Sequence, residues 1–309
     1  MTRARRNFVL FAVAVAGAGW LGVAADLAGG AELANDAAFS DSGGTPGMLV
    51  FILGPVVTAV VLFFASRDGA GPLGLTLRFP HRTRWFTAAL LLYPVITAVS
   101  VGAGLAVGAV TFSWTGSEPL VAAFLTVFAV QVIKNPIEEF IFRGYGTRTA
   151  MALSLPSRLA PHLLVGVVWS AWHLPLYLMW TSAADMRLVT SLSWPLFLVL
   201  MFAGLTAAAV LYGEVRVRTG SIWPGVVLHS MTNAIATPLV VNGHLGFTGH
   251  ADALFSPIAS SVVVMVLFGA LGLLLVSGRR PDQAPAPRPE RDPAVVLTTL
   301  HEAHGEFPG

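Results

Sequence analysis

The chain has 309 residues, of which 55% are hydrophobic and only 11% are charged, and its formal net charge is +2. Soluble domains carry roughly 25% charged residues, so this composition excludes an ordinary soluble protein and indicates one that lies in a membrane. Cysteine is absent, which excludes disulfides, thiolate metal sites and a cysteine nucleophile.

Eight apolar stretches are long enough to cross a bilayer, which takes about 20 mostly apolar residues. In chain order they cover residues 8–29, 48–66, 85–110, 119–142, 159–180, 192–212, 222–241 and 257–277. The predicted fold class is therefore all-α, a polytopic membrane helical bundle of about eight transmembrane helices. The predicted organisation is, in order: N-terminal spans in 1–118, a core of the fourth to seventh spans in 119–241, the last span in 242–278, and a disordered cytosolic tail in 279–309.

Arginines mark alternate segments between these spans. They occur before the first span, after the second, fourth and sixth spans, and in the tail, whereas the first, third and seventh loops contain neither arginine nor lysine. The fifth loop is a tie, because it contains both Asp185 and Arg187. The positive-inside rule then places both termini in the cytoplasm, and arginines used in this way predict no nucleic-acid partner. The residue usage favours a bacterial cell membrane. The arginine-led start leaves open a cleaved signal peptide, although its apolar run of about 18 residues exceeds the 7–15 of a signal core.

Two adjacent glutamates lie near the cytoplasmic end of the fourth span, where ionisable groups are costly and functional by default. Glu139 precedes Arg143 by four residues, which is the favourable order for an ion pair on a helix. Glu138 points about 100° away and has no predicted partner in its own turn, so it is expected to face the rest of the bundle. Pro136 is expected to kink the helix or start a new segment, with Asn135 as its cap. The alternative for Glu139 and Arg143 is a salt bridge at the headgroup level.

Polar residues also interrupt the fifth and seventh spans. In the fifth span His173 follows Trp169 by one helical turn, and in the seventh Asn233 follows His229 at the same spacing, so each pair shares a helix face. The alternatives are a neutral core histidine in the fifth span and interhelical hydrogen bonds in the seventh. The alternating charges of residues 214–218, at the exit of the sixth span, are interpreted as a topology signal.

One carboxylate, two histidines and one amide on three spans fit together chemically. A carboxylate with a histidine can deprotonate a water, and a histidine with an amide can donate hydrogen bonds to a tetrahedral oxyanion. Other hydrolase signatures are missing from the sequence: there is no His-Glu-x-x-His metal helix, no Gly-x-Ser-x-Gly elbow and no pair of aspartates within the spans. These residues are therefore consistent with a hydrolase active site in which a carboxylate and a histidine activate water.

The three motifs, taken in order, resemble those of the CPBP family, the CAAX proteases and bacteriocin-processing enzymes that include type II CAAX prenyl endopeptidases. The resemblance covers about residues 119–241, and Trp169 stands where the family more often has phenylalanine. It implies an intramembrane glutamic endopeptidase that needs no cofactor. The catalytic residues that it implies are Glu138 and His173, which would activate the water, and His229 and Asn233, which would form the oxyanion hole. The supporting residues are Glu139, Arg143 and Trp169.

Three other functions remain open on the sequence alone. The first is a non-catalytic immunity or scaffold protein of the same fold. The second is a proton-coupled transporter that uses Glu138 and His173 as a relay. The third is a zinc protease with Glu138, His173 and His229 as ligands. For the endopeptidase, the expected partners are the lipid bilayer and a membrane-embedded or membrane-associated protein or peptide substrate, whose identity the sequence does not specify.

Overall fold

A computed structural model describes residues 2–33, 44–66, 70–77, 83–115 and 118–278. The predicted tail, 279–309, lies outside these residues. Within them the chain is all-α apart from one two-stranded antiparallel sheet, β1 (Val110–Phe112) with β2 (Leu245–Phe247), in which Val110 is opposite Phe247. The predicted fold class is confirmed: this is a multi-pass membrane protein built as a helical bundle.

Seven helical segments in the described part are long and apolar enough to cross a membrane. They are α1 (Arg3–Ala28), α3 (Pro46–Ser66), α4 (Thr83–Ala106), α5 (Leu120–Glu139) with its continuation to Met151, α7 (Ala160–Pro175) with its continuation to Trp180, α9 (Trp194–Thr219) and α10 (Trp223–Val241). Two of them are continued by π-helical segments, α5 by η1 (Phe140–Thr147) and then α6 (Arg148–Met151), and α7 by η2 (Leu176–Trp180). The short helices α8 (Ala183–Val189) and α11 (Asp252–Phe255) complete the connections.

The expected eighth span is shorter than predicted. Residues 257–261 are not helical, and α12 (Val262–Ser277) has 16 residues. At about 1.5 Å per residue it extends roughly 24 Å, less than the roughly 30 Å of a bilayer's hydrocarbon core. The third predicted span is also too long at its end, because Val110 belongs to β1 rather than to α4.

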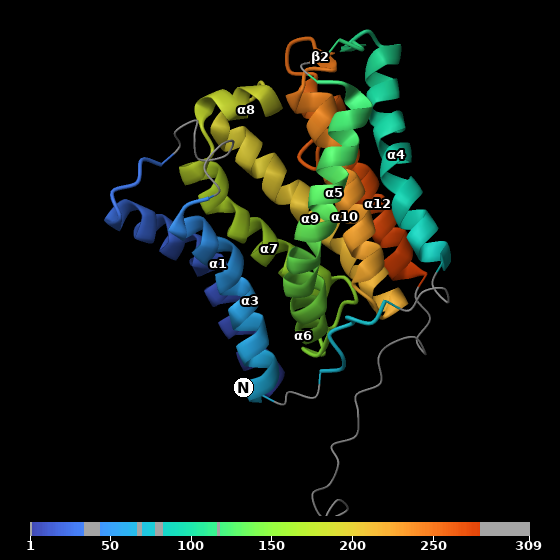
Figure 1. Ribbon diagram of the computed structural model, residues 1–309. Coiled ribbons are helices and arrows are strands. Elements are labelled where there is room, and N and C mark those ends of the chain that lie inside the picture. The colour runs from blue at the N-terminus through green and yellow to red at the C-terminus, as the bar shows by residue number, and fades with distance from the viewer. Residues whose placement is uncertain (1, 34–43, 67–69, 78–82, 116–117, 279–309) are drawn as a thin grey trace, which may run out of the picture.

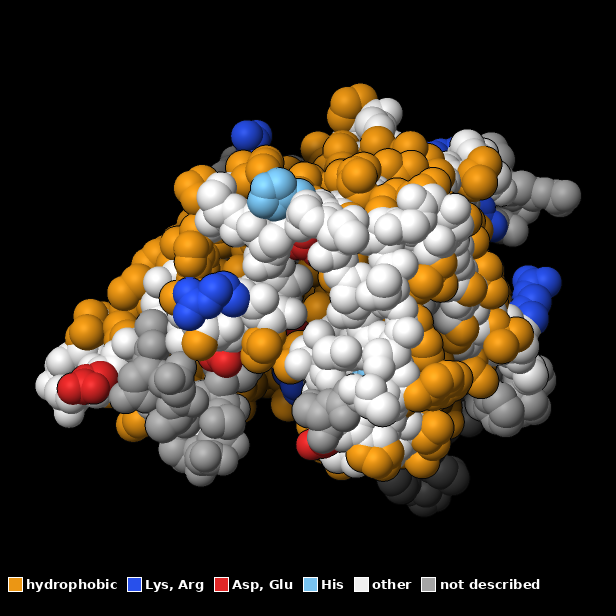
Figure 2. Space-filling model, turned by 90° about the horizontal axis from the view of Figure 1, so that it is seen from above, with side chains coloured by type: hydrophobic (Ala, Val, Ile, Leu, Met, Phe, Trp, Pro, Cys, Tyr) orange, Lys and Arg blue, Asp and Glu red, His pale blue; other side chains and the backbone are white. Residues whose placement is uncertain are grey.

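The helices are arranged in two groups that meet at α7. In the first, α1 and α3 form a hairpin that packs on α7; in the second, α9 packs on α7 and α12, and α10 packs on α4 and α5. Figure 1 shows the N-terminus and α6 at one end of the bundle and α8 and β2 at the opposite end. Seen from that second end, hydrophobic side chains dominate the flanks of the molecule (Figure 2), as expected for a surface that faces lipid.

The first helix is an integral part of the fold. Its Asp26 is 2% exposed, and the carboxylate accepts hydrogen bonds from the Thr45 hydroxyl, from the Gly47 N–H at 2.7 Å and from Trp180 Nε1 at 2.9 Å. These contacts join α1 to the start of α3 and to the end of η2.

Several charged residues predicted to mark topology also have structural contacts. Arg148 and Arg216 donate to the backbone carbonyls of Gly71 and Pro72, which holds the described segment 70–77 across the end of the bundle. Glu214 is fully buried, because α9 continues to Thr219; it accepts from Arg218 and contacts His162, each at 3.1 Å. Residues 214–218, which were predicted to be a topology signal, therefore include a buried carboxylate with two partners.

Candidate active site

The glutamate pair lies at the end of α5, where Glu139 contacts α10 and Glu138 contacts α7. Pro136 is accommodated inside α5 without ending it, and Asn135 is not a cap but a buried side chain that donates to Ser230 Oγ of α10 at 3.2 Å. No new helix therefore starts at Pro136, and the prediction that Asn135 caps one is wrong. The break comes four residues later, where η1 begins at Phe140. π-Helical turns are rare and frequently lie at functional sites.

Glu138 has a partner that the sequence analysis missed. Its side chain is nearly buried, and its carboxylate lies 2.8 Å from Lys134 Nζ and accepts a long hydrogen bond of 3.4 Å from Trp169 Nε1. Lys134 is the only lysine in the chain and stands one helical turn before Glu138, so the i, i+4 spacing was visible in the sequence. The lysine side chain is 48% exposed, so the ion pair extends from the buried carboxylate of Glu138 to the exposed surface of α5.

Glu139 contacts two cationic or protonatable groups at once. Its Oε1 lies 3.4 Å from Arg143 Nη1, which confirms the predicted pair, and 3.1 Å from His229 Nδ1. Glu139 and Arg143 are both fully buried, and within the described residues the three guanidinium nitrogens have no hydrogen-bond acceptor. The guanidinium instead lies over the rings of Trp169, at 4.0 Å, and Tyr212, at 4.9 Å, so cation–π contacts replace those hydrogen bonds.

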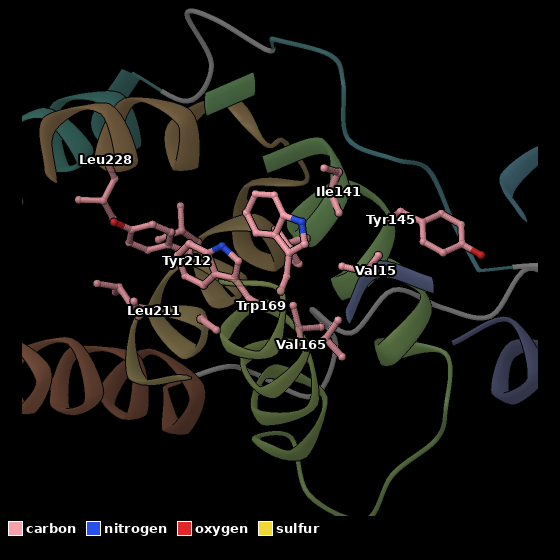
Figure 3. Close-up of a cluster of buried hydrophobic side chains, with 14 of the residues drawn as sticks. Val15, Ile141, Tyr145, Val165, Trp169, Leu211, Tyr212 and Leu228 are labelled. Atoms are coloured by element: carbon pink, nitrogen blue, oxygen red, sulfur yellow. The ribbon is translucent and has the colours of Figure 1, made fainter. Parts of the chain in front are cut away.

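Trp169 is the central contact of the site. Its ring centroid lies 5.9 Å from that of His173 and 5.6 Å from that of His229, while its indole N–H reaches Glu138. Figure 3 shows Trp169 and Tyr212 next to each other in the buried cluster, with ring centroids 6.0 Å apart. A bulky indole at this position therefore joins residues of α5, α7 and α10.

The hydrogen bond of His173 determines which ring nitrogen is available for chemistry. Its Nδ1 lies 2.9 Å from the Trp169 carbonyl oxygen. A carbonyl can only accept, so Nδ1 carries the proton and a neutral His173 presents an unprotonated Nε2. Glu138 and both histidines are brought together through Trp169, whose indole N–H reaches Glu138 and whose ring lies beside both imidazoles.

Asn233 lies one turn after His229 on α10 and contacts a second residue that the sequence analysis missed. Its Nδ2 donates to Gln131 Oε1 of α5 at 3.0 Å. An amide nitrogen has two N–H donors, so this bond occupies one of them. Gln131 lies seven residues before Glu138 on α5, and no short sequence motif connects it to Asn233.

The residues of the zinc alternative have other contacts. Glu138 meets Lys134 and Trp169, His173 donates to a backbone carbonyl, and His229 meets Glu139. Within the part of the chain that the structure describes, no group of three or more histidine, aspartate or glutamate side chains is arranged to hold a metal ion.

Comparison with known proteins assigns a family to this part of the chain. Residues 116–235 match the family described as type II CAAX prenyl endopeptidase Rce1-like. The match contains all three motifs and every residue of the site described above, and it confirms the resemblance seen in the sequence. No curated protein matches the chain.

Proposed function

We propose that this chain, whose residues 116–235 belong to the Rce1-like family of type II CAAX prenyl endopeptidases, hydrolyses a peptide bond of a membrane-associated protein or peptide. The proposed base is Glu138, assisted by His173, and the proposed oxyanion donors are His229 and Asn233. The proposed setting is a bacterial cell membrane with both termini in the cytoplasm.

A single observation carries the proposal: Trp169 contacts Glu138, His173 and His229 together. These residues come from three helices, and each is costly inside a membrane. Apolar side chains would be sufficient for packing between these helices. The contact of three ionisable side chains with one indole therefore favours a chemical role over a structural one.

Water activation follows from the hydrogen bonds of the site. A water between Glu138 and His173 would meet a carboxylate oxygen on one side and the unprotonated Nε2 on the other. Glu138 would take a proton from this water as its oxygen adds to the substrate carbonyl carbon, and would deliver that proton to the amide nitrogen as the C–N bond breaks. Positioned general bases of this kind typically contribute 10²–10⁴-fold.

The oxyanion donors have specific protonation needs. His229 directs Nδ1 at the carboxylate of Glu139, so only Nε2 remains for the oxyanion. Nε2 donates in either of two cases. In the first, the imidazole carries a proton on both nitrogens; in the second, Glu139 is protonated and donates to Nδ1, so that the proton of a neutral His229 is on Nε2. Glu139 would therefore act as a proton-sharing partner of His229, while Asn233 would use the amide hydrogen that Gln131 leaves free.

The test begins by finding the substrate. Membranes of the source cells, lacking their own copy, receive either the wild-type protein or Glu138→Gln, and new peptide ends are identified by mass spectrometry. A peptide released only by the wild type, and then cleaved by the purified wild type in liposomes, is the expected result. The matched control is Glu118→Gln, an exposed carboxylate just before α5, which should cleave normally.

Two outcomes would contradict the proposal. Full cleavage by Glu138→Gln would remove the glutamate from the mechanism. Absence of any wild-type cleavage, together with proton uptake into the liposomes that depends on Glu138, would favour the transporter alternative.

A further inference from the structure

Three polar pairs connect α5 and α10 along one line. Gln131 meets Asn233 at 3.0 Å, Asn135 meets Ser230 at 3.2 Å and Glu139 meets His229 at 3.1 Å. The α5 members are spaced by four residues, so they share a face that drifts by only about 40° per step. Residue numbers rise along α5 as they fall along α10, and the two helices pack against each other (Figure 1). We call these three pairs the polar ladder.

The Gln131 rung of the ladder differs from the other two in its surroundings. Asn135 and Glu139 are fully buried, but Gln131 is only partly buried and lies between Val130 and Val132, which are 55% and 38% exposed. An amide in such a lipid-facing stretch is costly unless it is paired, because lipid supplies no hydrogen bonds. Its cross-helix contact in the ladder is the bond from Asn233.

That bond determines the orientation of the Asn233 amide. Gln131 Oε1 only accepts, so the nitrogen end of the Asn233 amide must face it. If the Asn233 amide alone were flipped while Gln131 kept Oε1 in this position, two carbonyl oxygens would face each other, and Asn233 would direct Oδ1 instead of Nδ2 toward the site. For an oxyanion donor this matters, because an oxygen directed at a developing negative charge repels it.

The geometry points to Gln131 as a positioning residue that holds the amide of Asn233 so that its second N–H can donate to the oxyanion. This role rests on the proposed function. Gln131 acts through Asn233 and needs no contact with the substrate, which distinguishes it from the catalytic residues. Its effect should therefore disappear when Asn233 has no amide.

The experiment is a double-mutant cycle of Gln131→Leu and Asn233→Ala, with both single variants and the pair, assayed on the peptide released by wild-type membranes. Removing one oxyanion donor lowers kcat by about 10²–10³-fold. Because Gln131→Leu only misorients the donor, it should lower kcat by about 10–100-fold, with KM nearly unchanged. The pair should be no slower than Asn233→Ala alone, since residues that act as a unit are not additive.

Two variants separate positioning from a structural effect. Gln131→Glu keeps an acceptor oxygen for Asn233 and should recover most of kcat, whereas Val132→Leu, at the neighbouring lipid-facing position, should behave as the wild type. If Gln131→Leu does not fold in detergent, Gln131→Met provides an unbranched side chain that also lacks the acceptor.

The possible results separate this inference from the proposed function. Additive losses in the cycle, or full activity of Gln131→Leu beside an impaired Asn233→Ala, would overturn the role of Gln131 and leave the oxyanion hole in place. Full activity of Asn233→Ala would instead remove the oxyanion hole, and the role of Gln131 with it.

Discussion

The two adjacent glutamates should differ sharply in their contribution to stability. The change is Glu139→Gln compared with Glu138→Gln, each of which removes one charge and keeps the side-chain shape. Glu139 and its partner Arg143 are both fully buried. Lys134, the partner of Glu138, is 48% exposed. The same substitution therefore breaks a buried ion pair at one position and a half-exposed pair at the next.

The magnitudes follow from these exposures. Leaving one member of a buried pair uncompensated costs about 3–5 kcal/mol. The guanidinium of Arg143 keeps its contacts with the rings of Trp169 and Tyr212, so we expect a loss at the lower end, about 3 kcal/mol. An exposed ion pair contributes roughly 0.2–1 kcal/mol, and a glutamine at 138 still accepts from Trp169, so Glu138→Gln should cost at most about 1 kcal/mol.

The assay is a denaturant titration of the purified protein in detergent, which gives the free energy of unfolding. Cleavage is measured on the same samples. Both variants should lose activity, but only Glu139→Gln should lose substantial stability. The double variant Glu139→Gln with Arg143→Met is the control, because removing both charges should restore part of the stability. Equal losses for the two single variants, or no recovery in the double variant, would refute the reasoning.

Four further predictions concern the site and the topology. Asn233→Ala should lower kcat by about 10²–10³-fold with little change in KM, measured by steady-state cleavage. Lys134→Met should reduce cleavage, because it removes the counter-charge of a buried carboxylate, while Lys134→Arg should retain most of it; equal activity of the two would contradict this. Cleavage should persist with a strong chelator, and stoichiometric zinc that is lost together with activity in His229→Ala would decide for the metal alternative. Reporter fusions after residues 44 and 246 should report outside and one after residue 281 inside, and an external carboxyl terminus would contradict the assigned orientation.

Much of the local structure was available in the sequence. Hydropathy placed seven of the spans close to their helices, because crossing a bilayer requires a long apolar run. The pair of Glu139 with Arg143 was also predictable, since both lie on one helix and the 3.6-residue turn determines their distance. The same i, i+4 spacing predicts the contact of Lys134 with Glu138, which the sequence analysis overlooked.

The contacts between helices were decided only by the tertiary structure. The contact of His229 with Glu139, the contacts of Trp169 with residues of three helices and the hydrogen bond of Asn233 to Gln131 all depend on how each helix is rotated about its own axis. Apolar side chains facing lipid and apolar side chains facing the core look alike in sequence, so hydropathy does not reveal that rotation. The burial of Glu214 was missed for a related reason, because its partner His162 lies on another helix.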